Sequence, residues 1–384
     1  MWPHYDLDDI NIVSDILKSG KVNYWTGNNC IEFEKEFSRV FECKYSVALA
    51  NGSLALSAAY VAAGLKEGDE IITTPRTFIA TSSTAVLLGI KPIFADVDLN
   101  SGAITNNSIE KLITKKTKAI SIVHVGGWPA EMDKIKNLAN AYNLRLIEDC
   151  SQAHGAKFKG KNVGSFGDLA SWSFCQDKII STGGEGGMLS TNNKEMWKKV
   201  FSIKDHGKNL DKLNKFDKSI TFRWLHDSMG TNMRLTEMQS AIGRNQLRKL
   251  DNWIEKRKNN AMILYKSLYN LSSLRIPMPN SEIKHAWYRF YCYLRLGSLS
   301  DGWNRERIMR EIKDQGVPIF SGSCSEIYLE KCFKDLGIGP SDRLKNAKEL
   351  GESSLAFLVH PTITIEEQIR NGEIIRAVIL KATK

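Results

Sequence analysis

The 384-residue sequence predicts an α/β protein with a mostly parallel sheet flanked by helices, followed by a smaller C-terminal α+β region. Two observations predict this class. Between Tyr45 and about Ser173, short β-branched or apolar runs alternate with longer helical patterns, as in right-handed βαβ crossovers. A long helical pattern and then an aromatic, strand-like stretch follow. Because a domain has roughly 100–200 residues, we expect two domains, at residues 1–250 and 251–384.

Strands and helices are expected in regular order in the first region. The strands fall at 45–50, 70–74, 92–97, 119–125 and 144–149, and the helices at 53–65, 77–89 and 129–142. Ligands of such sheets bind beyond the carboxyl ends of the strands. The first candidates for a site are therefore the polar residues that directly follow the apolar runs: Asn51 to Ser53, Pro75 to Phe78, His124, and Asp149 to Gln152.

The remaining chain predicts a connecting helix and a second lobe. From Arg234 to about Tyr269 apolar residues recur at helical spacing, which indicates long helical structure between two lobes. Pro277 and Pro279 then interrupt the chain, and the segment 285–296 has an aromatic, strand-like character. We expect a smaller α+β lobe from about residue 250 to the end.

Composition excludes several classes of protein. With 42% hydrophobic and 25% charged residues, the chain is neither disordered nor collagen-like. Its net charge of +10 favours anionic partners, either phosphorylated metabolites or nucleic acid, but its lysines are interleaved with acids, so a generally basic surface is the alternative. The seven cysteines include no Cys-x-x-Cys pair, which fits a reducing, cytosolic compartment without a zinc site. We expect neither a signal peptide nor a membrane span.

The densest group of unusual residues is SFCQDKIISTGGEGGM, at 173–188, which joins an apolar strand, Lys178 and four glycines between Gly183 and Gly187. Glycines permit close backbone approach, so a ligand or another strand is expected here. The alternative is a hairpin with a surface lysine. The chain has neither the phosphate loop of nucleoside triphosphatases nor a dinucleotide fingerprint after a strand.

Two further candidates lie at strand ends. Asp149 ends the run LRLIED and needs a cationic or N–H partner if buried, although it suits a helix N-cap equally well. Gly52 and Ser53 begin a helix, where backbone N–H groups favour a phosphate, although a plain cap explains them too. Together with Lys178, these residues call for a ligand with a phosphate, a group that pairs with a carboxylate, and a carbon that an amine attacks. Pyridoxal 5′-phosphate has all three.

The sequence also resembles the DegT/DnrJ/StrS-type sugar aminotransferases, within the fold-type I pyridoxal-phosphate enzymes. The resemblance covers nearly the whole chain in the family's order, in YWTGNNCIEFEKEF (24–37), ANGSLAL (50–56), TTPRTFIAT (73–81), PIFADVD (92–98), HVGGWPAEMD (124–133), IEDCSQAHGA (147–156), SFCQDKIISTGGEGGM (173–188), DHG (205–207), GTNMRLTEMQSAIG (230–243) and HAWYRF (285–290). It implies a fold-type I aminotransferase with pyridoxal phosphate as cofactor.

The resemblance also implies roles for particular residues. Lys178 would form the Schiff base with the cofactor, and Asp149 would pair with the pyridine nitrogen and keep the ring electron-withdrawing. Gln152 would bond near the 3-hydroxyl, and Phe78 would stack on the ring. The phosphate would be held by four residues, the last from the neighbouring subunit of a homodimer with shared active sites: Gly52, Ser53, Ser173 and Asn232.

Several of these residues have structural alternatives. Phe78 could be plain core, Ser173 could bond only to nearby backbone, and the family-matching His154 and His206 could be structural. Two features depart from the usual family pattern. Ser53 replaces a commoner Thr but keeps a hydroxyl, and Trp128 follows His124, which would affect substrate choice if it lines the pocket.

The function implied is transfer of an amino group, from L-glutamate, onto a keto-sugar attached to a nucleotide diphosphate, in amino-sugar biosynthesis for a surface polysaccharide or glycoside. One alternative is a pyridoxamine-dependent sugar dehydratase, in which the lysine is typically replaced by His, and Lys178 argues against it. Another is a non-catalytic regulator, which would lack Lys178 or Asp149. Nucleic-acid binding would need a clustered basic face. The sugar, the nucleotide and the position aminated depend on loops near 21–30, 205–232 and 318–328.

Overall fold

The apolar runs of the first region form one large sheet in the computed structural model, which describes residues 1–214 and 224–384. The seven strands lie in the order β1-β9-β8-β5-β4-β2-β3. Their bounds are β1 Tyr45–Leu49, β2 Glu70–Thr73, β3 Lys91–Phe94, β4 Thr117–Val123, β5 Arg145–Asp149, β8 Leu169–Ser173 and β9 Gly187–Thr191. Neighbours from β8 to β3 pair in parallel, whereas β9 is antiparallel to β8 and β1. The predicted mostly parallel sheet is confirmed.

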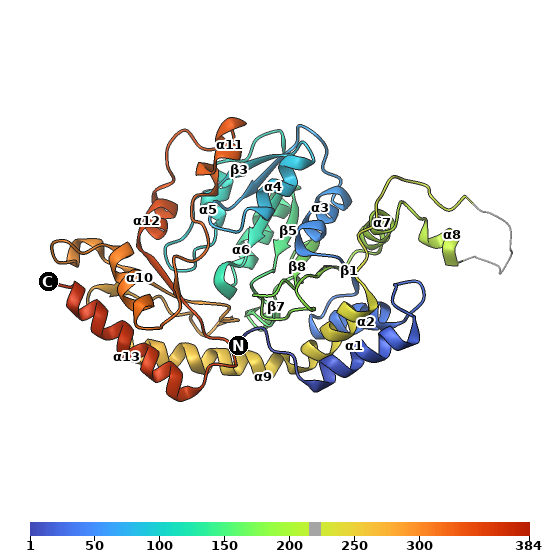
Figure 1. The fold of residues 1–384 in the computed structure, drawn as a ribbon. Helices are drawn as coiled ribbons and strands as arrows, with labels where there is room; N and C mark the ends of the chain where they lie inside the picture. The colour runs from blue at the N-terminus through green and yellow to red at the C-terminus, as the bar shows by residue number, and fades with distance from the viewer. Residues whose placement is uncertain (215–223) are drawn as a thin grey trace.

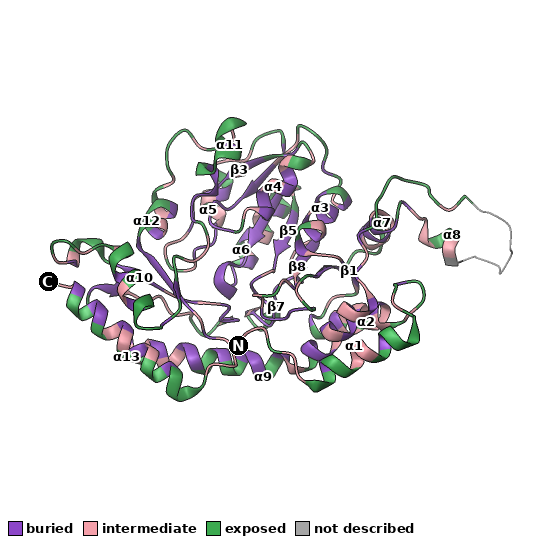
Figure 2. Ribbon diagram, in the orientation of Figure 1, coloured by how far each residue is buried: buried purple, intermediate pink, exposed green. Residues whose placement is uncertain are grey.

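Helices connect these strands and cover the sheet (Figure 1). Their bounds are α3 Gly52–Ala62, α4 Ala80–Leu87, α5 Asn106–Glu110, α6 Met132–Ala141, α7 Lys194–Lys204 and α8 Leu210–Asn214, with a 3-10 turn η1 at Val125–Gly127. The three helices expected at 53–65, 77–89 and 129–142 correspond to α3, α4 and α6. The strands are buried almost throughout, whereas the helices present mixed faces (Figure 2). The sheet is therefore the core that fixes the positions of the strand ends.

A long helix joins the two halves of the chain. Helix α9, Glu237–Leu268, has 32 residues and begins with a capping box between Thr236 and Gln239. The N-terminal helices α1, Leu7–Ser19, and α2, Asn29–Val40, pack against it, as does the C-terminal helix α13, Ile365–Ala382. The long helix expected after Arg234 is confirmed. The expected domain boundary at residue 250 falls within this continuous helix.

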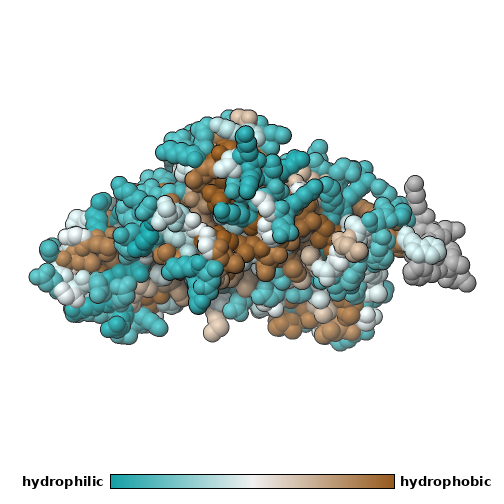
Figure 3. All heavy atoms as spheres, turned by 90° about the horizontal axis from the view of Figure 1, so that it is seen from above, coloured by the Kyte–Doolittle hydropathy of each residue, from teal (hydrophilic) through white to brown (hydrophobic). Residues whose placement is uncertain are grey.

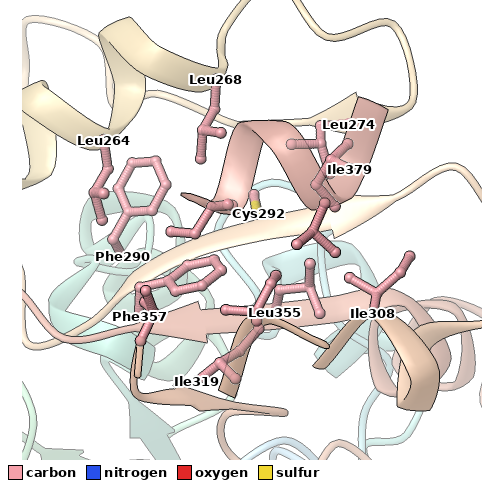
Figure 4. Packing of buried hydrophobic residues seen from close by; sticks show 14 of the residues in the cluster. Leu264, Leu268, Leu274, Phe290, Cys292, Ile308, Ile319, Leu355, Phe357 and Ile379 are labelled. Atoms are coloured by element: carbon pink, nitrogen blue, oxygen red, sulfur yellow. The ribbon is translucent and has the colours of Figure 1, made fainter. Parts of the chain in front are cut away.

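The C-terminal part is built on a small antiparallel sheet in the order β10-β12-β14-β13. Its elements are β10 Leu274–Arg275, β12 Phe290–Leu294, β13 Ile319–Phe320 and β14 Ser354–Phe357, with α10 Arg305–Asp314, α11 Lys331–Asp335, α12 Lys345–Ser353 and the 3-10 turns η2 Leu296–Ser298 and η3 Ile327–Leu329. Apolar side chains from the sheet, α9, α10 and α13 form its core (Figure 4). A third sheet, β11-β6-β7 (Ile283–Lys284, Lys157–Phe158 and Lys161–Asn162), ties this part to the first.

Residues 215–223, part of the 205–232 loop expected to affect substrate choice, lie outside the described residues. Helix α8 precedes them, beyond α7 on the right in Figure 1. Among the described helices, none combines the length and apolarity that crossing a membrane requires. Seen from above, apolar side chains gather across the middle of the molecule, with further apolar groups at the lower right edge and toward the left end (Figure 3).

Candidate active site

A cavity of about 550 Å³ opens between the carboxyl end of the large sheet and the C-terminal part of the chain. The large-sheet side contributes the loop before α4 and the loop between β8 and β9, and the C-terminal part contributes the start of β12 and the segment after β13. The lining residues are Thr77, Phe78, Ile79, Gln152, Asp177, Lys178, Tyr288, Arg289, Tyr291, Phe320, Gly322, Ser323, Cys324, Ile327 and Glu330. Three of the eight predicted site residues, Phe78, Gln152 and Lys178, are among them.

Lys178 lies on the wall of this cavity, with its side chain 14% exposed. Its Nζ is 3.5 Å from the Tyr288 hydroxyl and 3.6 Å from Asp177 Oδ1. Burial alone would lower the pKa of Lys178, but Tyr288 and the carboxylates of Asp177 and Asp149 outweigh burial and raise it. The alternative of a solvated surface lysine is therefore wrong.

The main chain around Lys178 is held by the N-terminus of the protein. The Trp2 indole N–H donates to the Lys178 carbonyl at 2.9 Å. The Tyr5 hydroxyl bonds to Ser181 Oγ at 3.0 Å and accepts from Gly183 N–H at 3.2 Å. The loop that carries Lys178 is thus fixed by residues about 176 positions earlier in the chain.

Asp149 ends β5 and is buried beneath α4. Its Oδ2 accepts from the Thr81 hydroxyl at 2.8 Å, and its Oδ1 accepts from Ser151 N–H at 3.1 Å. The second bond is the local turn contact that the capping alternative expects, while the first crosses from another element. Because Asp149 also acts on the pKa of Lys178, the two groups share one electrostatic environment.

Gln152 and Phe78 both line the cavity. Gln152 is buried, and its Oε1 accepts from Gly126 N–H at 2.7 Å, which fixes the side chain toward β4 and β5. Phe78 is 67% exposed and lines the cavity. The alternative that Phe78 belongs to the core is wrong, because this residue is exposed just before α4 begins.

Gly52, Ser53 and Ser173 meet where α3 starts, outside the lining of the described cavity. A Cβ on Gly52 would lie 2.7 Å from the Ser173 Cβ, and one on Gly187 would lie 2.4 Å from the Asn51 carbonyl oxygen. Only glycine permits these approaches, so the close strand approach expected of the glycine-rich segment is present. Ser53 is exposed, and the Ser173 hydroxyl accepts from Cys175 N–H at 3.3 Å, the local bond that its structural alternative expects.

The structure does not bring Asn232 to the cavity of its own chain: it is exposed and absent from the lining described above. Its segment pairs with Asp205, and its Oδ1 accepts from Arg234 N–H at 3.2 Å. The buried Asp205 in turn holds Arg234 at 2.7 Å and Lys208 at 3.1 Å. Asn232 is therefore presented on a braced, outward-facing loop.

One buried group combines metal-ligating residue types, namely His124, Glu148 and Cys150. Glu148 Oε2 accepts from His124 Nε2 and Gly164 N–H, and its Oε1 accepts from Phe166 and Gly167 N–H groups. The other ring nitrogen of His124 accepts from Ala130 N–H at 3.1 Å. The carboxylate and the ring are thus fully used within the protein, so this cluster braces the loop after β5 instead of offering ligands.

The sequence interpretation missed four residues of this region. Tyr288 and Arg289 lie in HAWYRF, which carried the resemblance but no role, and Asp177 precedes Lys178. Trp2 has no sequence signal, because its contact depends on the fold. Trp128, which we expected to matter if it lined the pocket, instead lies beside His285 on a separate cavity of about 440 Å³.

These residues fit pyridoxal phosphate. Lys178 supplies an amine, Asp149 a buried carboxylate, and Gly52 with Ser173 a tight cradle at a helix N-terminus, where backbone N–H groups favour a phosphate. The fold and the site define a fold-type I pyridoxal-phosphate enzyme.

Comparison with known proteins identifies the family. The model of the DegT/DnrJ/EryC1/StrS aminotransferase family matches residues 3–376, and the chain belongs to this family. It is similar to the solved structure of an aminotransferase from Psychrobacter cryohalolentis, with a TM-score of 0.98 and 46% identity, covering 100% of this chain and 99% of the other. It is 34% identical over 297 residues to a GDP-perosamine synthase of Escherichia coli O157:H7, or 77% of each chain.

A third similarity concerns the cofactor. The structure of NtdA from Bacillus subtilis with bound cofactor PMP matches with a TM-score of 0.84 and 26% identity, covering 97% of this chain and 81% of that one. The protein is therefore a pyridoxal-phosphate-dependent enzyme of the sugar aminotransferase family.

Proposed function

We propose that the protein transfers an amino group from L-glutamate to a keto-sugar linked to a nucleotide diphosphate. The observation that carries this proposal is the convergence of Lys178, Asp149 and the Gly52–Ser173 cradle at the carboxyl end of one sheet. Bound pyridoxal phosphate supplies an electron sink that makes the carbon bearing the amine acidic. The dehydratase alternative is disfavoured by Lys178, and the regulator alternative by the presence of both Lys178 and Asp149.

Each residue has a proposed task. Lys178 would hold the cofactor covalently, and its amine, once free, would take and return a proton as general base and acid. Asp149 keeps the pyridine nitrogen protonated, and its bond from Thr81 orients the carboxylate. Gln152 approaches the 3-hydroxyl, and Phe78 covers one face of the ring.

The phosphate is held by the N-terminus of α3 with Ser53 and Ser173, and by Asn232 of a second copy. The outward presentation of Asn232 supports this shared site.

The substrate class is supported by the relative that carries GDP in its name and by the net charge of +10, which favours an anionic nucleotide over a neutral sugar. We place the reaction in the cytoplasm, in amino-sugar biosynthesis for a surface polysaccharide or glycoside, without a membrane or nucleic-acid partner.

The test is a panel of nucleotide-linked keto-sugars supplied with L-glutamate, in which formation of 2-oxoglutarate and of the amino-sugar is measured. We expect at least one nucleotide-linked sugar to react and its free-sugar counterpart to react much more slowly. Equal rates with the free sugar would contradict the nucleotide requirement, and product formation only with another amine would contradict glutamate.

For the shared site, Asn232→Ala is mixed with Lys178→Ala. Recovery of activity in the mixture, relative to either variant alone, is expected if one active site combines residues from two chains. No recovery in dimers shown to exchange subunits would contradict it.

A further inference from the structure

Three residues that line the cavity, Tyr288, Asp177 and Arg289, form a series of polar contacts that reaches the amine of Lys178. Tyr288 is 6% exposed, and its hydroxyl lies 3.5 Å from Lys178 Nζ, which also sits 5.1 Å from the centre of the Tyr288 ring. The Tyr288 hydroxyl donates to Asp177 Oδ2. Since that hydrogen is committed to Asp177, the Tyr288 oxygen faces the lysine with its lone pairs and acts as an acceptor.

Arg289 completes this arrangement. Its guanidinium lies 4.5 Å from the centre of the Tyr288 ring and 3.8 Å from Asp177 Oδ2. It therefore holds both the ring and the carboxylate in place. Asp177 is 43% exposed on the lysine's own loop, whereas Tyr288 and Arg289 come from the C-terminal part of the chain. The contact exists only when the two parts are packed together.

We propose that Tyr288 is a further catalytic residue, the oxygen that receives the Lys178 amine when it is released from the cofactor, with Asp177 as a positioning residue acting through it. This inference rests on the proposed function, which makes Lys178 alternate between a bound and a free amine. An N–H of the free amine donates to the Tyr288 oxygen, so the nitrogen lone pair remains available for the proton of the substrate carbon.

The same contact stabilises the product of that proton transfer. When Lys178 takes the proton, the carbon–hydrogen bond breaks and its electron pair stays with the carbon, where bound pyridoxal phosphate would withdraw it. A third N–H bond forms, and the amine becomes an ammonium that donates to the Tyr288 oxygen. Since a hydrogen bond to an ionised group is about twice as strong as one to a neutral group, Tyr288 favours the ammonium and makes Lys178 a stronger base. A distance of 3.5 Å is long, and such contacts tighten during reaction.

The charged and titratable groups around Lys178 come from several elements, and all affect its proton affinity. Burial lowers the pKa of Lys178, and Tyr288, Asp177 and Asp149 raise it by a larger amount. The positive groups nearby are Arg289 and the buried Arg257 of α9, and the neutral His154 follows β5. Loss of the Tyr288 oxygen removes one stabilising contact and leaves burial in place, so the amine should lose its proton at lower pH.

The experiment uses cofactor-free enzyme and follows, as a function of pH, the rate at which added pyridoxal phosphate becomes covalently attached. Only the unprotonated amine attacks, so the midpoint of this profile reports the pKa of free Lys178 without requiring turnover. Tyr288→Phe should move the midpoint to lower pH by about one to two pH units. In turnover it should lower kcat about 10- to 100-fold with little change in KM.

Tyr291→Phe is the matched control, because it removes another hydroxyl of the same cavity, one that accepts from Ser323 N–H instead of contacting Lys178. Its midpoint should equal that of the wild type. Asp177→Asn provides a second variant if Tyr288→Phe does not fold. It removes both the carboxylate that accepts the Tyr288 hydrogen and a negative charge 3.6 Å from Lys178 Nζ, so it should shift the midpoint in the same direction.

The outcomes separate the two proposals. If the wild type forms no borohydride-stable link at Lys178, the proposed function itself fails. Suppose instead that the wild type forms the link and that the Tyr288→Phe pH profile superimposes on the wild-type profile. Tyr288 then has no such role, while the proposed function stands. The Asp177→Asn profile replaces that of Tyr288→Phe if the latter variant does not fold. An equal shift in Tyr291→Phe would also overturn the inference.

Discussion

The two carboxylates at the end of β5 are adjacent in the chain, yet they belong to different regions of the molecule. Glu148 points to the side of the sheet where it accepts four hydrogen bonds, from three backbone N–H groups and His124, and has no capacity left. Asp149 points to the other side and, within residues 1–214 and 224–384, accepts only from Thr81 and Ser151. Successive side chains of a strand point to opposite faces of the sheet. Glu148 therefore has a structural role on one face, whereas its neighbour Asp149 is available to a ligand on the other.

The pKa of Glu148 shows what the brace achieves. Burial would raise this pKa, but His124 and the N–H groups of Gly164 and Gly167 outweigh burial and lower it. A buried carboxylate is thus kept ionised by His124, which follows β4, and by N–H donors from the loop before β8. Burial and residue type alone therefore do not identify a site. The number of bonding positions still free, and the presence of a cavity nearby, distinguish Asp149 from its neighbour.

The largest effect is expected for Asp149→Asn. The amide preserves the shape of the side chain but removes the charge that we propose to pair with the ring nitrogen, and removing one partner of a buried pair costs roughly 3–5 kcal/mol. Transamination should fall by about 10²- to 10³-fold while the cofactor is retained and the unfolding midpoint changes little. Activity equal to wild type would show that Asp149 is no more than a local cap.

Glu148→Gln should produce the opposite pattern. The amide NH₂ must face at least one of the donors that the carboxylate now accepts, so the protein should lose about 3 kcal/mol of stability. Denaturant unfolding measures this loss, and the folded fraction should still bind cofactor and turn over. A Glu148→Gln variant that is as stable as the wild type but does not bind the cofactor would contradict the view that Glu148 is structural and Asp149 functional.

Acid should lower the free energy of unfolding through the buried His154. Burial lowers the pKa of His154 to about 3, and neither ring nitrogen has a hydrogen-bond partner among the described residues. The unfolded chain takes up this proton first as pH falls below the usual 6.5, so the stabilising contribution is present above that value and is lost toward pH 3. Between pH 7 and 5 the loss should be about 2 kcal/mol.

The control is His154→Phe, which replaces the ring within a pocket that already contains Phe41, Trp172 and Phe174. Its free energy of unfolding, measured across the same pH interval, should fall less steeply than that of the wild type. Identical slopes would mean that His154 does not contribute to the acid sensitivity.

The smallest effect is expected for Trp2→Phe. This variant tests whether the hydrogen bond to the Lys178 carbonyl matters mainly for activity, as we expect of Asp149, or mainly for stability, as we expect of Glu148. Phenylalanine keeps an aromatic face toward Trp253 and Arg257 and loses only the N–H that binds the Lys178 carbonyl. We expect about 1 kcal/mol less stability and a slower covalent attachment of cofactor. Tyr5→Phe, which loses a contact to the same loop, should leave the Lys178 carbonyl bond in place.

Much of the fold was predictable because it depends on local patterns. Apolar runs alternating with helical periods predict β1 to β5 and the helices α3, α4 and α6, and the spacing after Arg234 predicts α9. Asp149 was found for the same reason, since it ends an apolar run at the edge where parallel strands place their ligands. Lys178 was singled out by the glycines that follow it and by the family resemblance.

The rest of the site depends on contacts between distant positions. Tyr288 reaches Lys178 across 110 residues and Trp2 across 176, and no periodic pattern encodes such pairings. The sequence also left open whether Trp128 lines the active-site cavity, because the direction of a side chain in a loop depends on residues that are distant in the sequence. The role of Asn232 comes from the family resemblance and stays a prediction, because its side chain is exposed outside the cavity of its own chain and the proposed contact needs a second copy.

The most direct test of the central claim is to reduce the purified protein with borohydride and to map the modified peptide by mass spectrometry. We predict a visible absorption band that disappears on reduction, a pyridoxyl mass on the peptide containing Lys178, and neither feature in Lys178→Ala. A colourless protein that binds no pyridoxal phosphate, or a label on another lysine that persists in Lys178→Ala, would contradict the account.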